Sequence, residues 1–308
     1  AVGITYMNAT QGWVPTFDEA VADVPVTGND NGIFGFGVDA SADVGITNLV
    51  SNVGVVATDT AAVGTARKHT AATQYGGDKG IFGFGNPGPT ADTNLVSNTG
   101  VVATDTTGVG TARTALAACS YGTDKGIFGF GSGLTAVTNL VSNAGVVATD
   151  TTGVGTARSD LAACEYGDDK AIFGYGNSGS MTAVTNLVSN AGVVATDVSG
   201  VGTARNQIAA CSYGYDKGIF GYGDTGSVSS LTNLVSNAGV VATDTTGVGT
   251  ARERLAATQY GKDKGIFGYG RSGSLLSMTN LVSSSGVVAS DVTGVGTARQ
   301  LLAACSFN

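Results

Sequence analysis

The chain has 308 residues and a formal net charge of −8, with 49 glycines and only 12% charged residues. Glycine normally makes up about 7% of a protein and charged residues about 25%. Charges at fixed repeat positions nearly cancel, so variable and terminal positions supply −7 of the net charge. An acidic variable surface repels phosphate groups, so we expect no nucleic-acid partner. No apolar run approaches the roughly 18 residues of a membrane span, so we expect no membrane insertion.

Residues 1–31 come before the first repeat, and we interpret them as an N-terminal segment or linker. They include the only tryptophan, Trp13, which we expect to anchor this segment by packing rather than to bind a ligand. The chain begins without a methionine and without the basic and apolar regions of a signal peptide. We therefore expect a processed product or part of a longer protein.

From residue 32 onward the sequence consists of near-copies of one unit. Two phrases recur six times, Ile-Phe-Gly-(Phe/Tyr)-Gly and Gly-Thr-Ala-Arg, and the isoleucines follow one another at steps of 45 to 48 residues. These isoleucines are Ile33, Ile81, Ile127, Ile172, Ile219 and Ile266. The arginines are Arg67, Arg113, Arg158, Arg205, Arg252 and Arg299. A period of about 40 to 50 residues is typical of the blades of a β-propeller.

Each unit contains four candidate strands. After Arg205 they are residues 208–213, 219–223, 232–236 and 240–243. Turn residues separate them, because Gly214 to Gly218 has the composition of a hairpin turn and Asn237-Ala238-Gly239 that of a second turn. The first strand carries small residues that suit a crowded propeller centre, and glycines between aromatics in the second strand allow neighbouring blades to approach closely.

The two ends of the repeat region complement each other. The first unit begins at its second strand, at Ile33, whereas the chain ends on an extra first strand, Leu302 to Phe307. We therefore predict an all-β protein with a six-bladed β-propeller of four short antiparallel strands per blade over residues 32–308. The C-terminal strand is expected to close the ring and to remove exposed sheet edges.

Four cysteines occupy one repeat position, which threonine fills in the other units. They are Cys119, Cys164, Cys211 and Cys305, with Thr73 and Thr258 as the substitutes. Equivalent positions in successive blades are expected to lie too far apart for a disulfide, which needs Cα atoms within about 7 Å. We interpret the cysteines as buried small residues, with a redox or metal role as the alternative.

This pattern resembles the kelch-repeat family. Kelch units begin after an arginine and carry a small-residue strand, an aromatic strand ending in glycine and a strand opening with asparagine. The resemblance covers residues 32 to 308, but the paired glycines are replaced by Gly221-Tyr222-Gly223 and the usual tryptophan of the fourth strand by Val240. The chain is thus similar to a divergent kelch propeller, in the highly duplicated style of phage tail and environmental virus proteins.

The charged repeat positions suggest structural roles. We interpret the six arginines as partners of backbone carbonyls or of the six Ala-(Thr/Ser)-Asp aspartates, with a ring of ligand-binding arginines as the alternative. The aspartates of the Asp-Lys pairs are expected to stabilise hairpin turns rather than to bind calcium, which takes six to eight oxygen ligands.

Nothing in the sequence indicates an active site. His69 is the only histidine, so neither a histidine-based metal cluster nor a copper-radical oxidase of the kelch type is expected, and the Asp-box of sialidases is absent. A hydrolase that uses carboxylates alone is the remaining enzymatic alternative. We predict no catalytic residues, no metal and no cofactor.

Two stretches differ among the copies: the loop between the second and third strands, and the two residues after each arginine. In a four-stranded blade both stretches emerge on the same face. Drift at unconstrained surface loops explains this variation most simply, and a recognition face is the alternative. The candidate ligand-binding residues are Asn177, Ser178, Asp224, Thr225, Arg271, Ser272, Asn206, Gln207, Glu253 and Arg254.

We expect a non-enzymatic structural and recognition module, located outside the cell or on a virion surface like a phage tail-fibre domain. Its expected partner is a cell-surface glycan or protein, with other appendage subunits or a homo-oligomer as further partners. One alternative is a soluble multivalent lectin with near-equivalent sites between blades. Another is a filament or assembly subunit that binds no ligand.

Overall fold

Every regular element in the computed structural model is a β-strand, over the residues that the structure describes, 2–8, 12–18 and 30–307. β1 (Val2–Asn8) and β2 (Gly12–Asp18) pair as an antiparallel hairpin. Residues 19–29 and the side chain of Trp13 lie outside the described part. The proposed division at residue 31 and the packing role of Trp13 therefore stay predictions.

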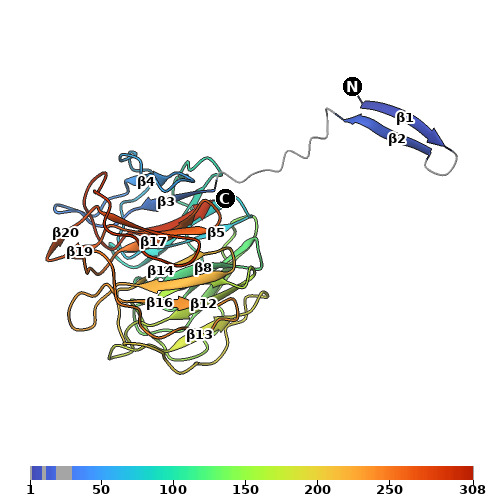
Figure 1. Cartoon of the computed structure of the whole chain (residues 1–308). Coiled ribbons are helices and arrows are strands. Elements are labelled where there is room, and N and C mark those ends of the chain that lie inside the picture. The colour runs from blue at the N-terminus through green and yellow to red at the C-terminus, as the bar shows by residue number, and fades with distance from the viewer. Residues whose placement is uncertain (1, 9–11, 19–29, 308) are drawn as a thin grey trace.

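The repeats form six three-stranded antiparallel sheets, which Figure 1 shows as successive blades. The first two blades contain β22 (Ala303–Phe307), β3 (Asn31–Gly35) and β4 (Thr47–Val50), then β5 (Ala71–Tyr75), β6 (Lys79–Gly85) and β7 (Thr90–Val96). The third and fourth contain β8 (Ala117–Tyr121), β9 (Lys125–Gly129) and β10 (Thr138–Val141), then β11 (Ala162–Tyr166), β12 (Lys170–Gly174) and β13 (Thr185–Val188). The fifth and sixth contain β14 (Ala209–Tyr213), β15 (Lys217–Gly221) and β16 (Thr232–Val235), then β17 (Ala256–Tyr260), β18 (Lys264–Gly268) and β21 (Thr279–Val282). A small hairpin of β19 (Arg271–Ser272) and β20 (Ser274–Leu275) lies in the last blade's loop.

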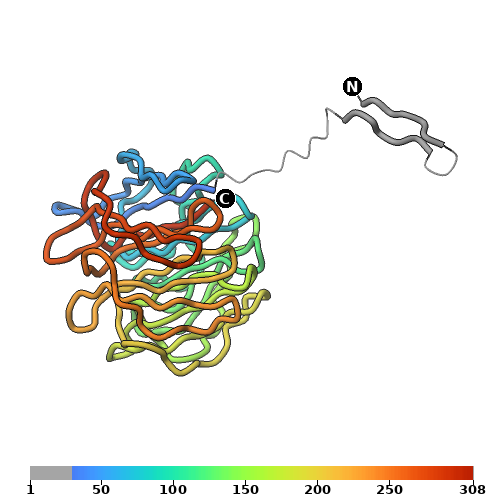
Figure 2. Tube along the Cα trace, viewed as in Figure 1, coloured from blue at the N-terminus to red at the C-terminus, as the bar shows by residue number. Residues whose placement is uncertain are grey.

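The C-terminal strand closes the ring, as predicted. β22 pairs with β3 in antiparallel register, with Ala303 opposite Gly35 and Phe307 opposite Asn31. In Figure 2 the trace of residues 31–50 runs beside the C-terminal end of the chain. The first blade is therefore assembled from both ends of the repeat region, and β22 covers the inner edge of β3.

The prediction of four strands per blade is wrong in one respect, because the fourth segment is not a continuous strand. In the fifth blade it meets β16 only at two isolated bridges, Val235 with Val241 and Thr232 with Thr245. One extra residue lies between these bridges on the outer segment, which is a β-bulge. The bulge interrupts the ladder and places the Asp244 carboxylate where it accepts a hydrogen bond of 2.9 Å from Asn233 Nδ2.

Glycines and aromatic residues fit the sheets together, as predicted for the second strand. A Cβ atom on Gly221 would lie 2.7 Å from Cζ of Phe267 in the next blade, so only glycine fits at this distance. The ring of Tyr222 packs against the same Phe267 with centroids 5.1 Å apart. Equivalent aromatic pairs recur around the ring at 5.1 to 5.2 Å, so the same aromatic contact joins each blade to the next.

The six repeat arginines are buried between blades. Arg205 lies 4.5 Å above the ring of Tyr175 in the fourth blade. Its Nε donates to the carbonyl oxygen of Tyr222 at 3.0 Å and its Nη2 to Asn233 Oδ1 at 2.5 Å, both in the fifth blade. Asp244 Oδ1 lies 3.6 Å from Nη1. Because the cation has partners from two blades, it stabilises their junction despite its desolvation.

The four cysteines are free and buried, as predicted. A Cβ atom on Gly218 of β15 would lie 2.5 Å from the sulfur of Cys164, and the sulfurs of Cys211 and Cys305 meet Gly265 and Gly80 in the same way. Three of the four sulfurs therefore fill a space that a neighbouring glycine leaves. Burial raises the pKa of the Cys211 thiol to about 12. The thiol therefore stays protonated near neutral pH and is a poor nucleophile.

Candidate functional site

The two variable stretches lie side by side in the structure. In the fifth blade the amide of Asn206 donates to the carbonyl of Asp224 at 3.1 Å, and the amide of Asp224 donates back at 2.9 Å. The same bridge joins the corresponding residues of other blades: Lys68 with Asn86, Ser159 with Asn177, Glu253 with Arg271 and Val38 with Gln300. The loop after the second strand and the residues after each arginine therefore belong to one surface, which we call the variable face.

The centre of this face is closed by a ring of backbone hydrogen bonds. The second residue after each arginine donates its amide to the carbonyl of its counterpart in the preceding blade, at 2.9 to 3.2 Å. We call the ring and its side chains the axial mouth; its members are His69, Ala115, Asp160, Gln207, Arg254 and Leu301. Each of the six blades thus contributes one residue to this ring, and the six side chains all differ.

All six residues of the axial mouth adopt the left-handed backbone conformation, with φ between 52° and 57°. Non-glycine residues in this region carry a strain of about 1 kcal/mol or more each. None of the six is glycine, although glycine is the residue that adopts this conformation without strain. Side chains are therefore retained here against a backbone preference, which is common at binding sites.

Below the axial mouth lies a shallow cavity of about 80 Å³. Its floor is apolar except for one threonine, with Leu116, Leu161, Ile208, Leu255, Leu302 and Thr70 as the contributing residues. The Thr70 hydroxyl is buried and has no hydrogen-bond partner. The volume of this cavity suits one small group of a ligand, such as a methyl, acetamido or carboxylate group, rather than a whole sugar ring.

Arg254 is the positive group of the axial mouth. Its Nε donates to Gln207 Oε1 at 3.0 Å and its Nη1 lies 3.4 Å from Gln300 Oε1. The Glu253 carboxylate lies 3.5 Å from Nε. These contacts hold the guanidinium beside the cavity, where it could bind a carboxylate or a carbonyl oxygen.

His69 lies on the same ring as Asp160 and Arg254. Burial lowers the pKa of His69, and Arg254 and Lys68 lower it further, while Asp160 and Asp43 oppose this effect. The imidazole is therefore neutral near pH 7 and offers one donor and one acceptor. The axial mouth thus combines a cation, an anion, an amide and a neutral imidazole within one ring.

The outer candidates on the longer loops are partly engaged in their own turns. Asn177 Oδ1 accepts a hydrogen bond from the amide of Gly179 at 2.9 Å, and Asp224 Oδ1 accepts one from the amide of Gly226 at 2.8 Å. Ser178 and Thr225 follow these residues and are half-buried. Arg271 and Ser272 form β19, also half-buried. These residues shape the rim of the variable face.

Asn206, Gln207, Glu253 and Arg254 lie nearest the axis, but they differ in exposure. Asn206 is only 7% exposed, so it is less suited to direct ligand contact than its neighbour Gln207. The candidate set did not include His69, Ala115, Asp160 and Leu301, which complete the axial mouth. The signal was present in the sequence, since all four occupy the variable position two residues after an arginine.

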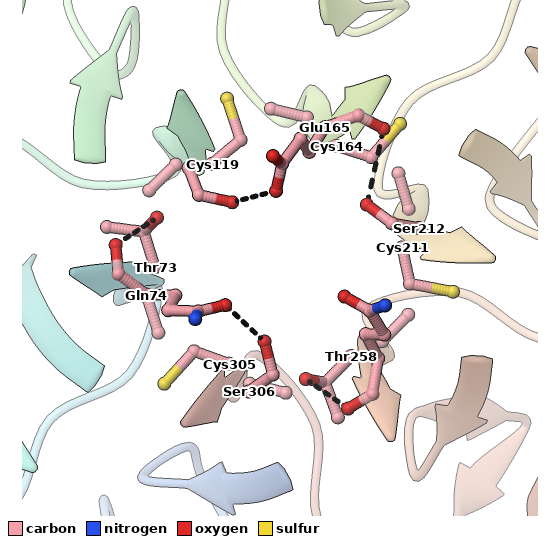
Figure 3. Close-up of a pocket in the computed structure, with 18 residues that line it drawn as sticks. Thr73, Gln74, Cys119, Cys164, Glu165, Cys211, Ser212, Thr258, Cys305 and Ser306 are labelled. Carbon is pink, nitrogen blue, oxygen red and sulfur yellow. Dashed lines mark hydrogen bonds between the residues drawn. The ribbon is translucent and has the colours of Figure 1, made fainter. Parts of the chain in front are cut away.

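A second polar position was also missed, on the wall of the axial channel beneath the cavity. The first strands of all six blades line this channel, which encloses about 60 Å³. Each strand contributes one residue of the same polar position to this wall. These polar residues are Gln74, Ser120, Glu165, Ser212, Gln259 and Ser306. In Figure 3 the side chains of Gln74, Glu165, Ser212 and Ser306 face the axis, while the cysteine sulfurs point away from it.

Grooves at the outer junctions between blades form another set of candidate sites. The groove between the fourth and fifth blades has Leu187, Val201 and Val240 among its walls and encloses about 190 Å³. Its counterpart between the fifth and sixth blades has Leu234, Val248 and Val287 and encloses about 200 Å³. The near-identity of the two follows from the repeat, and both are mainly apolar.

Comparisons with known proteins give no assignment. No protein-family model matches the chain. No curated protein matches it either.

In the described residues, no helix is long and apolar enough to cross a membrane. Over the same part of the chain, no three His, Cys, Asp or Glu side chains are grouped so that they could hold a metal ion.

Proposed function

We propose that this protein is a non-enzymatic recognition module that binds a glycan or protein of a cell surface through its axial mouth. The observation that carries this proposal is the contrast within the repeat. Inter-blade packing positions are nearly identical in every copy, whereas the six side chains of the axial mouth all differ and are held in a strained ring. A single composite site of this kind is suited to one asymmetric ligand.

The wider setting of the proposal comes from the sequence pattern. We propose a divergent relationship to kelch propellers, supported by the spacing of the arginines and by the order of small-residue and aromatic strands. We also propose a location outside the cell or on a virion appendage, where a duplicated and rigid ring would display the variable face. No nucleic-acid or membrane partner forms part of this proposal.

The experiment is glycan-array binding of the purified protein, followed by calorimetry of any ligand found. Arg254→Ala removes the cation of the axial mouth, and Ala115 shows that alanine fits this position of the ring. We expect a loss of affinity of about tenfold or more, as for a hydrogen bond to a charged group. Lys262→Thr is the matched control, since it also removes a positive charge but lies in a hairpin turn, where Thr123 is the natural equivalent.

A loop exchange tests the rim of the same site. Replacing residues 224–231 with the short 132–137 loop should weaken binding without lowering the melting temperature, because both loops join the same two strands in different blades. If both the Arg254→Ala protein and the loop-exchange protein bound the ligand with wild-type affinity, recognition by the variable face would be contradicted.

The second candidate is a multivalent lectin, and the equivalent grooves between blades favour it. A lectin of this kind would bind several identical ligands per chain, whereas the axial mouth provides one site. Calorimetric stoichiometry separates the two. In the lectin case, Val240→Asp in the groove wall would remove one site while Arg254→Ala would have no effect.

The third candidate is a structural assembly subunit that binds no small ligand. Valines at the outer turns are exposed in every blade, by 64 to 65%, at Val55, Val101, Val146, Val193, Val240 and Val287. An exposed apolar perimeter favours contact with other subunits. Sedimentation velocity over a range of concentrations tests this candidate, and a monomer at every concentration would count against it.

A further inference from the structure

Among the described residues that line the axial channel, Glu165 alone is charged. The equivalent position is serine in three blades and glutamine in two, so one carboxylate interrupts a ring of neutral polar groups. The hydroxyl of Ser120 donates to Glu165 Oε2 at 2.6 Å, and Figure 3 shows Glu165 at the edge of the central opening. The channel therefore combines one anionic oxygen site with hydroxyl and amide groups from the other five blades.

The negative charge of Glu165 has no cationic partner in the channel. None of the described residues that line the cavity is lysine, arginine or histidine. The charged residues whose fields act on Glu165 are Asp168 and Asp169, and both raise its pKa, after burial as the main cause. Glu165 is half-buried. A carboxylate held largely away from water without a basic partner either takes up a proton or binds a cation.

We propose that the axial channel binds one monovalent alkali cation, with the Glu165 carboxylate as its anionic ligand. The cavity of about 60 Å³ holds an ion and a few water molecules, because one water needs about 10–15 Å³ of such space. Hydroxyl oxygens of Ser120, Ser212 and Ser306 and amide oxygens of Gln74 and Gln259 surround the same space. Hard cations prefer oxygen ligands of this type.

The charge of the site favours a monovalent ion. A single carboxylate neutralises one positive charge, whereas a divalent cation would remain undercompensated, and affinity for calcium rises with the number of charged ligands. Within the described residues no second carboxylate lines the cavity. The cysteine sulfurs point away from the axis (Figure 3), so they offer no soft ligand to a transition metal.

The test measures thermal unfolding of the full chain at pH 8 in sodium, potassium, calcium or N-methylglucamine chloride of equal ionic strength. We expect the wild-type melting temperature to be higher in sodium or potassium by at least about 2 °C, because an ion that binds only the folded state stabilises it. Glu165→Ser and Glu165→Gln should lose this difference. Both substitutions occur naturally at equivalent positions, so both are expected to fold.

A crystal soaked in rubidium chloride gives a direct readout. An anomalous peak in the channel beside the Glu165 carboxylate, absent from Glu165→Ser, would support the proposal. A melting temperature that is the same in all salts, together with no peak, would overturn it and leave Glu165 as a protonated acid. Stabilisation by calcium alone would overturn the assignment to a monovalent ion.

Discussion

The two ends of the propeller axis use the same backbone geometry in different ways. At the variable face, the axial mouth links neighbouring blades by amide-to-carbonyl bonds from residues with φ of 52° to 57°. At the opposite end, hairpin glycines with φ of 58° to 64° donate to an aspartate carbonyl of the next blade at 2.7 to 2.8 Å. These glycines are Gly76, Gly122, Gly167, Gly214 and Gly261. One end is built from glycine, and the other from six different side chains.

Steric space explains the difference. A Cβ atom on Gly214 would lie 2.7 Å from the carbonyl oxygen of Ser284 in the next blade, so a side chain is excluded at the hairpin end. At the axial mouth the corresponding space opens towards the cavity, and side chains of every size fit. Variation at the hairpin end is confined to the following turn residue, such as Thr123 or the exposed Tyr215. Side chains therefore vary where the fold leaves room for them.

The largest expected effect comes from removing residues 301–308, which breaks the axial mouth at Leu301 and removes β22. The edge of β3 would then be unpaired, and the first blade would lose a strand. We expect aggregation or a fall of the melting temperature by more than about 15 °C, since several kcal/mol are lost. Size-exclusion chromatography and thermal melting measure this. A monomer with an unchanged melt would show that ring closure contributes little.

Gly214→Ala tests the glycine end directly. The added methyl group meets the Ser284 carbonyl in a left-handed backbone conformation, so we expect destabilisation of about 2–4 kcal/mol. Gln207→Ala in the same blade is the matched control at the axial mouth, where Ala115 shows that the change is tolerated; there we expect less than about 0.5 kcal/mol. Urea denaturation measures both. Equal effects would break the distinction between the two ends.

Glu165, on the channel wall between the two ends, predicts a pH dependence. Burial raises its pKa to about 7, so the folded state binds more protons than the unfolded state between about pH 4.5 and 7. Stability is therefore lost as pH rises through this window. In buffers without alkali cations, Glu165→Gln should be more stable than the wild type at pH 8 by about 1–2 kcal/mol, and equally stable at pH 4.5. The same stability difference between the two proteins at pH 8 and at pH 4.5 would contradict a raised pKa of Glu165.

Ala115→Gly gives the smallest effect and the finest test of strain. Ala115 has φ of 53°, and glycine would relieve this conformation while adding flexibility to the unfolded chain. We expect a net stabilisation of about 0.5 kcal/mol, and unchanged ligand affinity if binding depends on the polar members of the axial mouth. A destabilised variant would show that the ring is not strained at this position.

The repeat pattern alone predicted the all-β class, the six units and the closing strand, because spacing and end complementarity are properties of the sequence. The error concerned the fourth strand, whose bulge depends on one extra residue between Val241 and Thr245 relative to β16. Such a shift follows from pairing between strands, and it cannot be read from the apolar run Val240-Val241-Ala242 itself. The burial of Arg205 over the ring of Tyr175 in the preceding blade likewise depends on the packing of two blades, so the sequence of one unit did not predict it.

The sequence by itself determined which positions are constrained and which vary, since six internal copies provide that comparison within one chain. It did not determine that His69, Asp160, Gln207 and Arg254 meet on one hydrogen-bonded ring, because these residues lie at least 47 positions apart in the chain. Nor did it place Glu165 in a channel without a basic partner. Only closure of the ring brings the six blades to a common axis, and it is this closure that turns scattered single differences into one composite site.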